Sequence, residues 1–399
     1  MSDGRIQSPD SSKDATVVII GGGVMGCSIL YNLAMRGVKN LVLLERDVIA
    51  SGGTGRSQSI SRMHYSNSFT ASLAWESLKI LRNFEDTVGG SAGFTPTGYL
   101  LIVGSEGKEA VEQNVAMQQS LGINTQLLSP QDAKQVAPMF ELEDAEVIAY
   151  EPESGYSDPY AVSSTYARRA QEMGADVSLW TSVTGIRVSH GRVEGVQTAQ
   201  GDISAPRVIV AAGPWSRMLF QAIGVDLPIR PMRHQVTILR RPQDLLPSHP
   251  IVSDLINNIG LRPEASNFTL LGVNDADAFV DLDTFNHGVD MATVAEGMRR
   301  MVRRCPLLRQ AYFRGGWAGL YDVTPDWHPI LDAVAGIEGL YCAVGFSGHG
   351  FKLSPMIGVV MAELITQGQA TSVDITPMNW SRFRVGKLIT ARHGYKVLA

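Results

Sequence analysis

The sequence predicts an α/β fold that combines a parallel-sheet domain, assembled from separated segments, with a mostly antiparallel α+β domain. Two apolar strands, residues 17–20 and 40–44, flank a glycine-rich turn and a helix, as at the start of a parallel sheet. Further strands of the buried type follow much later, in RVIVAAGPWS and GLYCAVG. Residues 225–318 are rich in strands and contain one helix. We therefore expect the first domain at residues 15–88, 151–224 and 319–385, and the second at residues 89–150 and 225–318.

Length and composition exclude several classes of function. The 399 residues suffice for two domains with substantial cores, and the formal net charge of −5 gives no basic footprint for nucleic acid. The three cysteines lie far apart and fit neither a disulfide framework nor a metal site, so we expect no metal and a cytoplasmic protein. No apolar run reaches the ~18 residues that span a membrane. The polar residues 1–14 predict a disordered tail.

The turn between the first two strands has the pattern G-x-G-x-x-G, formed by Gly21, Gly23 and Gly26. A helix is predicted from Val24 to Arg36, and the second strand stops at Glu45. In such a unit the glycines make the turn, admit a pyrophosphate and let the helix pack closely, while the acid binds ribose hydroxyls. The pattern predicts a dinucleotide site and fits FAD and NAD equally.

The remaining elements follow from periodicity and end signals. Residues 51–65 are rich in glycine and serine and carry Arg56 and Arg62, so they start irregularly. The last predicted helix has Ser354 as its N-cap and Pro355 at its first position. We expect helices at residues 70–88, 106–121, 159–173, 289–304 and 354–365, and a hairpin that turns at His190-Gly191.

Three stretches far apart in the chain, VVIIGGGVMG, VIVAAGPWS and AVGFSGHGFKLSP, resemble the FAD-dependent amine oxidoreductases of the D-amino-acid oxidase superfamily. The chain is most similar to the sarcosine oxidases, both the monomeric form and the β subunit of the heterotetrameric form. The most specific motifs are TGRSQSISRMHY, GLYDVTPDWHPILD and GFSGHGFK. The resemblance implies FAD, since a plain NAD enzyme needs no GFSGHGFK loop, and a flavin between the Rossmann-type domain and an antiparallel sheet.

The resemblance also implies which residues hold FAD. The glycines of the turn take the pyrophosphate, Glu45 takes the adenosine ribose beside Arg46, and Val183 holds the adenine through its backbone. Residues 54–59 pass near the isoalloxazine ring, and residues 345–352 lie at its pyrimidine end. There the N-terminus of the last helix would stabilise the charge of the reduced ring. The predicted cofactor residues are Gly21, Gly23, Gly26, Glu45, Arg46, Thr54, Arg56, Ser57, Ser59, Val183, Ala211, Gly213, Trp215, Gly345, Gly348, Gly350, Phe351 and Lys352.

Two cations, Arg62 and Lys352, match the positions that grip the substrate carboxylate in sarcosine oxidases. Two buried cations close together cost several kcal/mol unless an anion joins them, so we expect a substrate with a free carboxylate. The alternative, that either cation pairs with a protein carboxylate, stays open. Tyr65, Tyr321 and Trp317 could wall the pocket or belong to the core. The predicted substrate-binding residues are Arg62, Tyr65, Tyr321 and Lys352.

The implied reaction is the oxidation of a secondary α-amino acid, which carries an N-methyl, N-alkyl or cyclic amine. A hydride equivalent moves from the α-carbon to flavin N5, and water hydrolyses the resulting imine. Positioning and exclusion of water carry most of this chemistry, so no catalytic triad is required. His349, flanked by glycines, is expected to support the loop or contact the flavin rather than act as a base. The predicted catalytic group is Arg62, Lys352 and His349.

Two positions depart from the family pattern. Where monomeric sarcosine oxidase has the cysteine that bonds the flavin, this chain has Gly319, so we expect FAD to be held noncovalently. Where those oxidases carry a lysine over the flavin, this chain has Leu270, and no lysine occurs between Lys134 and Lys352. We therefore expect oxygen to be a poor acceptor and the enzyme to be a dehydrogenase, or an oxidase that relies on another group such as Arg262.

Two other functions stay open on the sequence. The superfamily also contains 2-hydroxy-acid and polyol-phosphate flavoproteins, although the ISRMHY and FSGHGFK motifs favour amines. The chain could also be the flavin-bearing subunit of a multi-subunit amino-acid dehydrogenase. The electron acceptor is then oxygen or a redox partner, and both homo- and hetero-oligomers are compatible with the sequence.

Overall fold

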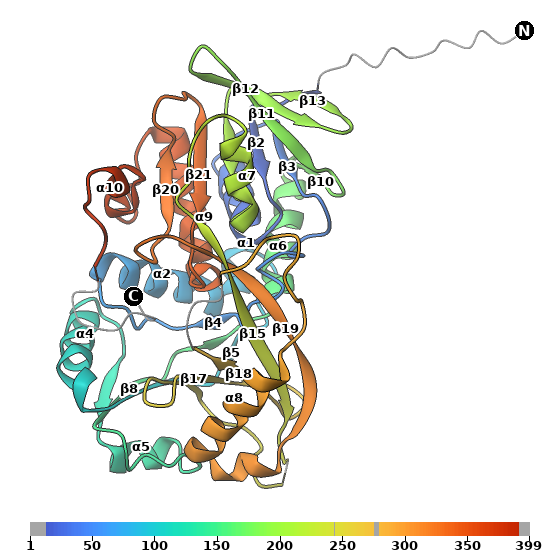
Figure 1. The fold of residues 1–399 in the computed structure, drawn as a ribbon. Coiled ribbons are helices and arrows are strands. Elements are labelled where there is room, and N and C mark those ends of the chain that lie inside the picture. Colours follow the sequence, from blue (N-terminus) through green and yellow to red (C-terminus); the bar gives the residue numbers. More distant parts are fainter. Residues whose placement is uncertain (1–12, 243, 275–278, 391–399) are drawn as a thin grey trace, which may run out of the picture.

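The computed structural model describes residues 13–242, 244–274 and 279–390. The predicted disordered tail lies outside the described residues as far as residue 12, whereas Lys13–Asp14 form a short strand, β1, paired with β13 (Gly201–Ser204). Figure 1 shows an upper part built on a parallel sheet and a lower part built on a larger, mostly antiparallel sheet. Both sheets are of the predicted kind, and the predicted fold class is confirmed.

The upper part is built on a six-stranded sheet with five parallel strands and one antiparallel edge strand. Strands β2 and β3 are wholly buried and apolar, as strands covered on both faces must be. The later strands β14 and β21 come from RVIVAAGPWS and GLYCAVG, so the sheet joins segments far apart in sequence. In sheet order the strands are β10 (Asp176–Ser178), β3 (Leu41–Leu44), β2 (Val17–Ile20), β14 (Val208–Val210), β21 (Leu340–Val344) and β20 (Ile330–Ala333).

The two faces of this sheet are covered differently. Val17 and Ile19 of β2 pack with α1 (Val24–Met35), α6 (Pro159–Glu172) and α9 (Gly350–Gln367). Their neighbours Val18 and Ile20 pack toward a four-stranded sheet on the opposite face. Each such side chain contributes about 1.5–3 kcal/mol by leaving water. That second sheet has the order β1, β13, β12 (Arg192–Thr198) and β11 (Val183–Ser189), and its hairpin turns at His190-Gly191 as predicted.

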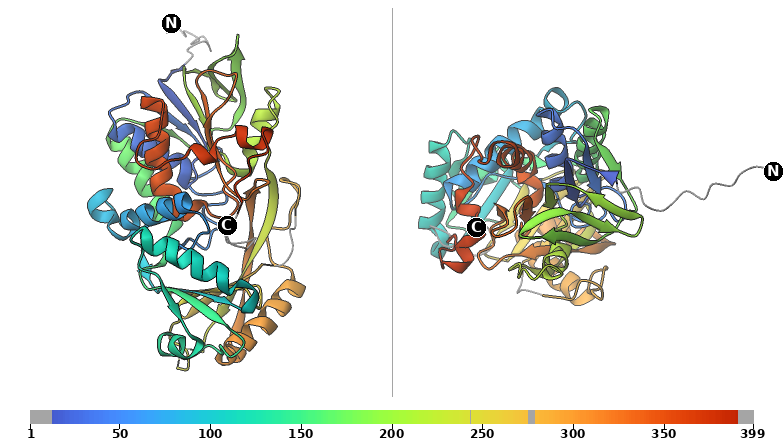
Figure 2. Two further views of the ribbon diagram at one scale, coloured as in Figure 1. Left: turned by 90° about the vertical axis from the view of Figure 1, so that its left-hand side faces the viewer. Right: turned by 90° about the horizontal axis from the view of Figure 1, so that it is seen from above.

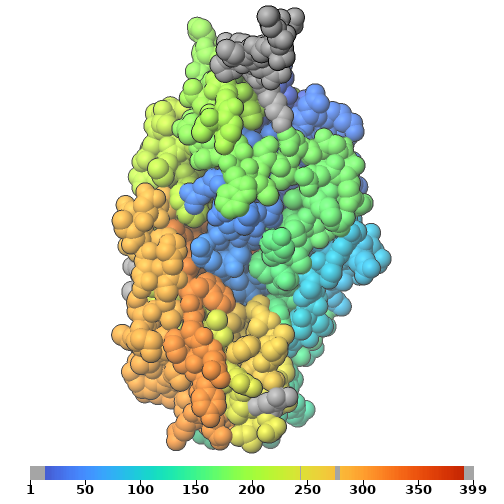
Figure 3. Space-filling view, turned by 90° about the vertical axis from the view of Figure 1, so that its right-hand side faces the viewer, coloured from blue at the N-terminus to red at the C-terminus, as the bar shows by residue number. Residues whose placement is uncertain are grey.

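The lower part is an eight-stranded sheet in which every pair is antiparallel except β16 and β6. Its long strands β15 and β19 run from the lower part up to the parallel sheet (Figures 1 and 2). In Figure 3 the blue N-terminal segments reach the surface between the green segments above and the orange and yellow segments below. In order the strands are β19 (Tyr312–Val323), β15 (Arg230–Arg240), β18 (Phe268–Val273), β17 (Ile259–Glu264), β16 (Ile251–Asp254), β6 (Tyr99–Val103), β8 (Val147–Glu151) and β7 (Gln126–Leu128).

The other elements are short or lie at the surface. A three-stranded sheet is formed by β4 (Ile60–Ser61), β9 (Gly155–Tyr156) and β5 (Thr95–Pro96). The remaining α-helices are α2 (Ser68–Arg82), α3 (Phe84–Thr87), α4 (Lys108–Ser120), α5 (Pro130–Val136), α7 (Ser216–Gln221), α8 (Met291–Arg304) and α10 (Ser381–Arg384). Within the described ranges, no helix combines the length and apolar character that crossing a membrane requires.

Two helix predictions were inaccurate. The helix expected over residues 70–88 is divided at Asn83 into α2 and α3. The helix expected to begin at Ser354 begins one turn earlier, at Gly350, so Pro355 lies inside it. A proline there leaves the carbonyl four residues earlier without its usual donor. The Ser354 hydroxyl donates to that carbonyl, of Phe351, at 2.8 Å, and the Ser77 hydroxyl accepts from Met356 N–H at 3.2 Å.

Candidate active site

A cavity of about 670 Å³ lies between the two large sheets. One wall consists of the residues that follow the carboxyl ends of β2, β3, β14 and β21, where ligands bind in open α/β sheets. The opposite wall comes from β15, β16, β17, β18 and β19 of the eight-stranded sheet. The volume lies within the usual range of cofactor and ligand sites.

The glycine-rich turn forms the first wall where β2 meets α1. Gly21 has φ +112°, and a side chain there would lie 2.5 Å from Ala211 O. A side chain on Gly26 would lie 1.9 Å from Gly21 O, so only glycine lets the helix pack this closely. No side chain caps α1 at Gly23, and the Val24 N–H donates to the Thr54 hydroxyl at 3.0 Å. The turn leaves room for a phosphate at the positive end of the helix.

The predicted adenosine end is built around Glu45, which is 8% exposed. Its carboxylate accepts from Gly22 N–H at 2.6 Å and from Asp47 N–H at 3.0 Å, which fixes its orientation toward the turn. The Arg46 guanidinium lies over the Trp215 ring, 4.0 Å from its centroid. Val183, Ala211 and Gly213 also line the cavity.

Residues 51–59, which follow β3 and mostly line the cavity, are held by hydrogen bonds within the segment and by one from Trp317 of β19. The Arg56 guanidinium donates to Ser51 O at 2.5 Å and to Gly52 O at 3.3 Å, and Trp317 Nε1 donates to Arg56 O at 2.8 Å. Ser59 has φ +54°, and its N–H donates to the Ser57 hydroxyl at 2.9 Å. The Ser59 hydroxyl has no hydrogen-bond partner among the described residues, although it is buried at the cavity wall.

The loop from Gly345 to Lys352 forms the far end of the same wall. Gly345 N–H donates to the Asp322 carboxylate at 2.6 Å. Gly348 has φ +87°, and a side chain there would lie 2.8 Å from the Tyr321 ring. Because α9 starts at Gly350, Phe351 and Lys352 occupy its first turn, and the helix N-terminus lies closer to the cavity than the sequence predicted.

Arg62 and Lys352, each 7% exposed, both line the cavity. Arg62 donates to His64 O and lies over Tyr65, 4.8 Å from its ring centroid. Lys352 makes no hydrogen bond or ion pair with any residue in the described ranges, and no carboxylate there lies within the 4.0 Å of an ion pair with either cation. Within the described ranges, the two buried cations are therefore not neutralised by direct carboxylate contacts. A substrate carboxylate is predicted to supply the missing anion.

A buried carboxylate, Glu151, lies behind these cations and acts on them at longer range. It accepts from Met63 N–H at 2.9 Å and from the Ser154 hydroxyl at 2.6 Å. Burial, together with the positive charge of Arg62, holds the pKa of the Lys352 ammonium well below its usual value, and Glu151 opposes that shift. Burial likewise lowers the pKa of the His349 imidazole well below its usual value, and Lys352 and Arg62 lower it further.

A family model described as FAD dependent oxidoreductase matches residues 16–364. The chain belongs to the FAD-dependent oxidoreductase family. This oxidoreductase is 28% identical to the mitochondrial sarcosine dehydrogenase of Homo sapiens over 89% of its own chain but only 40% of that protein. It is 29% identical to the sarcosine oxidase subunit beta of Arthrobacter sp, covering 98% of this chain and 96% of that one. The structure of L-proline dehydrogenase from P. horikoshii superposes with a TM-score of 0.88 at 26% identity, over 95% of this chain and 100% of that chain.

FAD, the predicted cofactor, is confirmed by the family, and the residues present fit it. A side chain at Gly21 or Gly26 would collide with backbone atoms and displace the turn against which the pyrophosphate would lie, and the Glu45 carboxylate is fixed beside the same turn. When bound, the flavin supplies the acceptor for a hydride equivalent. The chain spans about 40% of the length of the human sarcosine dehydrogenase that it matches, so that protein's activity is not carried over as a whole.

The structure brings most of the predicted site residues of this FAD-dependent oxidoreductase to one cavity. Tyr321, His349 and Lys352 line it, as do the cofactor residues other than Gly26 and Gly345. Both glycines lie behind the wall. Gly26 lets α1 pack closely against the turn, and Gly345 donates its N–H to the Asp322 carboxylate. Tyr65 also lies behind the wall, fully buried beneath Arg62. Gln58, within the predicted segment 54–59, also lines the cavity. Strand pairing brings in further cavity residues that no local motif in the sequence marks: His234, Val236, Ser253, Gly260 and Gly272.

Proposed function

We propose that this FAD-dependent oxidoreductase oxidises a secondary α-amino acid whose carboxylate is held by Arg62 and Lys352. The observation that carries the proposal is the presence of two buried cations in the cofactor cavity without a carboxylate in ion-pair contact. When Arg62, Lys352 and Glu151 are all ionised, the three groups carry a net charge of +1, which one substrate carboxylate neutralises. The relatives named for sarcosine and for L-proline, both secondary amino acids, support the same substrate class.

The residues of this chain would bind and orient the substrate rather than form covalent bonds with it. The Arg62 guanidinium offers a planar set of donors to a carboxylate, and Lys352 adds a point charge. His349, whose pKa is lowered, stays neutral beside them and adds no third cation. The stacked rings of His234 and Tyr321, with centroids 4.8 Å apart, form part of the wall that excludes water. Held in this way, the amine is positioned for oxidation at its α-carbon by the flavin.

Anaerobic mixing of the purified yellow protein with a panel of carboxylates tests the proposal. The panel contains sarcosine, proline and N-methyl amino acids, their primary amino-acid counterparts, and matched 2-hydroxy acids. We expect secondary amino acids to bleach the oxidised flavin absorbance fastest. Bleaching by 2-hydroxy acids alone would assign the alternative chemistry, and the absence of bleaching by every amine would contradict the proposal.

The flavin is proposed to be held noncovalently. Gly319 lines the cavity and offers no sulfur, while Cys27, Cys305 and Cys342 are buried and lie outside the cavity lining. Precipitating the protein with acid should leave the yellow colour in the supernatant. Yellow colour that stays with the pellet would demonstrate a covalent bond to another side chain.

The electron acceptor is proposed to be something other than oxygen. Leu270 is 3% exposed and lies opposite Arg262 in the β17–β18 pair, and neither side chain lines the cavity. Arg262 is already engaged by Glu264 and by Gln58 O, the latter at 2.8 Å. Without a free cation from this position, charge on reduced oxygen is poorly stabilised. Turnover in air compared with turnover with an artificial dye tests this, because fast peroxide release with no gain from the dye would reject it.

A second candidate function is that of a flavin-bearing subunit in a larger complex. It is favoured by the end-to-end similarity to the Arthrobacter protein, which is itself named as a subunit. Size-exclusion chromatography of the protein, alone and co-expressed with the products of neighbouring genes, separates a self-sufficient enzyme from a subunit. Full amine-dependent bleaching and dye turnover by the isolated chain would contradict a need for partners.

A further inference from the structure

A row of small residues crosses the eight-stranded sheet where the sheet faces the cavity. Ser253 of β16 pairs with Gly260 of β17, Gly260 pairs with Gly272 of β18, and Gly272 pairs with Val236 of β15. Paired residues on neighbouring strands point to the same face, and all four line the cavity. We call these four residues the glycine trough. At ~4.8 Å between strands, it is about 14 Å long.

The close approach of Gln58 and His234 accounts for glycine at position 272, but the packing of the sheet does not account for Gly260. On the opposite face the neighbours Ile259, Leu261 and Leu271 are at most 1% exposed and form a core with α8. Gly260 does not have a positive φ, and a Cβ there would meet only Val252 O, at 3.8 Å. Glycine in a strand interior weakens the strand and is typical of places where something approaches the backbone closely. At Gly260 the missing side chain therefore provides space in the cavity.

The glycine trough lies within reach of the substrate cations. A Cβ on Gly272 would lie 3.0 Å from the Gln58 amide nitrogen, so Gln58 stands over the trough. Gln58 and Arg62 are four positions apart in the chain, a span of at most ~14 Å, and both line the cavity. The Gln58 amide oxygen is buried and has no hydrogen-bond partner in the described parts of the chain. The trough and the substrate cations therefore line one continuous cavity, and a molecule held by its carboxylate at Arg62 can extend toward the trough.

We propose that the glycine trough accommodates a bulky, mainly apolar group of the substrate, carried on the α-carbon or closed into a ring with the amine. The floor of the trough is the valine side chain, glycine backbone and one serine hydroxyl, and the Gln58 amide and the His234 ring stand at Gly272. No carboxylate or ammonium group of the described residues lines these four positions, so a charged group on the substrate would find no ionic partner there. The enzyme then prefers such amino acids to sarcosine, whose α-carbon carries no side chain. This inference rests on the proposed function and identifies its substrate class.

The test is to fill the trough with Gly260→Val. Valine suits a strand, and its Cβ would make an ordinary van der Waals contact with Val252 O at 3.8 Å, so we expect thermal stability not to fall. We expect wild-type kcat/KM to be at least about tenfold higher for N-methylleucine and N-methylphenylalanine than for sarcosine. In Gly260→Val the values for the two bulky substrates should fall about tenfold or more, while that for sarcosine changes less than about threefold. Gly104→Val is the matched control, because its Cβ would meet only Ile256 Cγ1, at 3.8 Å, and Gly104 does not line the cavity.

Measuring the affinity of carboxylates that are not oxidised tests this inference separately from the proposed function. Acetate, methylthioacetate and phenylacetate are titrated by perturbation of the flavin spectrum in both variants. Loss of phenylacetate affinity in Gly260→Val, with acetate affinity kept, supports the trough even where no amine reduces the flavin and the proposed function has failed. Equal losses for every ligand, unchanged affinities, or loss of bound FAD from Gly260→Val would overturn the inference, the last by showing that the trough seats the cofactor.

Discussion

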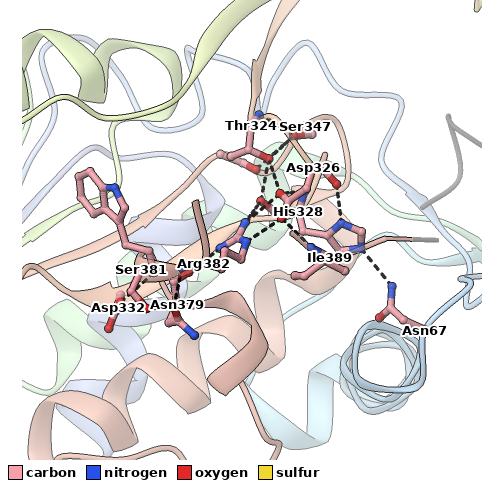
Figure 4. A network of polar contacts seen from close by, with 12 residues as sticks. Asn67, Thr324, Asp326, His328, Asp332, Ser347, Asn379, Ser381, Arg382 and Ile389 are labelled. Atoms are coloured by element: carbon pink, nitrogen blue, oxygen red, sulfur yellow. Dashed lines mark hydrogen bonds and ion pairs between the residues drawn. The ribbon is translucent and has the colours of Figure 1, made fainter. Parts of the chain in front are cut away.

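The protein buries cations in two kinds of surroundings, with and without a carboxylate partner. Arg382 is 2% exposed and forms a two-point ion pair with Asp326, at 2.7 and 3.0 Å, near the C-terminal end of the described chain (Figure 4). Arg304 is 1% exposed and contacts Asp254 and Asp144, each at 2.7 Å. Arg62 and Lys352, similarly buried, have no carboxylate within ion-pair distance in the described ranges.

A missing carboxylate does not by itself mark a binding site. Arg241 is 4% exposed and also has no ion-pair carboxylate among the described residues, yet it donates to carbonyl oxygens, including that of Pro247 at 2.9 Å, and to the Thr269 hydroxyl at 3.2 Å. Arg62, in contrast, has one carbonyl partner, and Lys352 has none among the described residues. What distinguishes the site is the combination of buried charge, unused donors and a cavity.

The structural pair should show the largest effect. Arg382→Ala leaves Asp326 buried without its partner, which costs about 3–5 kcal/mol of stability. It also removes the donors to His328 O at 2.7 Å and Asn379 O at 2.9 Å that fix this segment (Figure 4). Chemical denaturation would measure the loss, and Arg382→Lys should recover part of it. The KM of the folded fraction should stay unchanged; a selective rise in KM would erase the distinction between the two kinds of surroundings.

Substitutions of the site cations should lower substrate affinity and leave stability unchanged or higher, the reverse of Arg382→Ala. Lys352→Met and Arg62→Ala should each raise the dissociation constant of a substrate carboxylate about 100-fold or more, ~2.7 kcal/mol, because a desolvated anion loses a charged donor. Stability of the unliganded protein should hold or rise in Lys352→Met, since an uncompensated buried charge is removed. Titration by flavin spectral perturbation measures affinity and thermal unfolding measures stability. Unchanged affinity in both variants would refute the carboxylate grip.

The sequence predicted this site where its geometry is local and failed where it depends on distant partners. The glycine turn and Glu45 form one continuous unit, so spacing alone located them. The start of α9 was wrong because Ser77, on another helix, helps to compensate for Pro355 inside it. The glycine trough was missed because strand pairing brings its four residues together and the cavity lies across from them. From the sequence alone, a single glycine in a strand-rich stretch does not show that it lines a cavity.

The response to pH should be the smallest of these effects. It also separates most clearly the cations of the site from the cations that have a carboxylate partner. Burial first, and then the charge of Arg62, lower the pKa of Lys352, while Glu151 opposes the shift and the neighbouring His349 has a lowered pKa itself. Carboxylate binding requires the ammonium form, so affinity should fall as pH rises through that lowered pKa, by at most about tenfold per pH unit. Over the same range the unfolded chain holds a proton that the folded chain has released, so the Lys352 contribution to stability of the unliganded protein rises with pH.

The structural pair should respond only to acid. The hydrogen bonds and charge of Arg382 outweigh burial and keep the pKa of Asp326 below its usual value, so its stabilisation is present above about pH 3.8 and is lost as pH falls through the lower, folded-state pKa. Acetate affinity measured over the pH range in which acetate stays ionised should therefore slope downward in wild type as Lys352 loses its proton, stay flat in Lys352→Met and slope as in wild type in Asp326→Asn. A slope that persists in Lys352→Met would assign the titration to another group and remove Lys352 from the anion site.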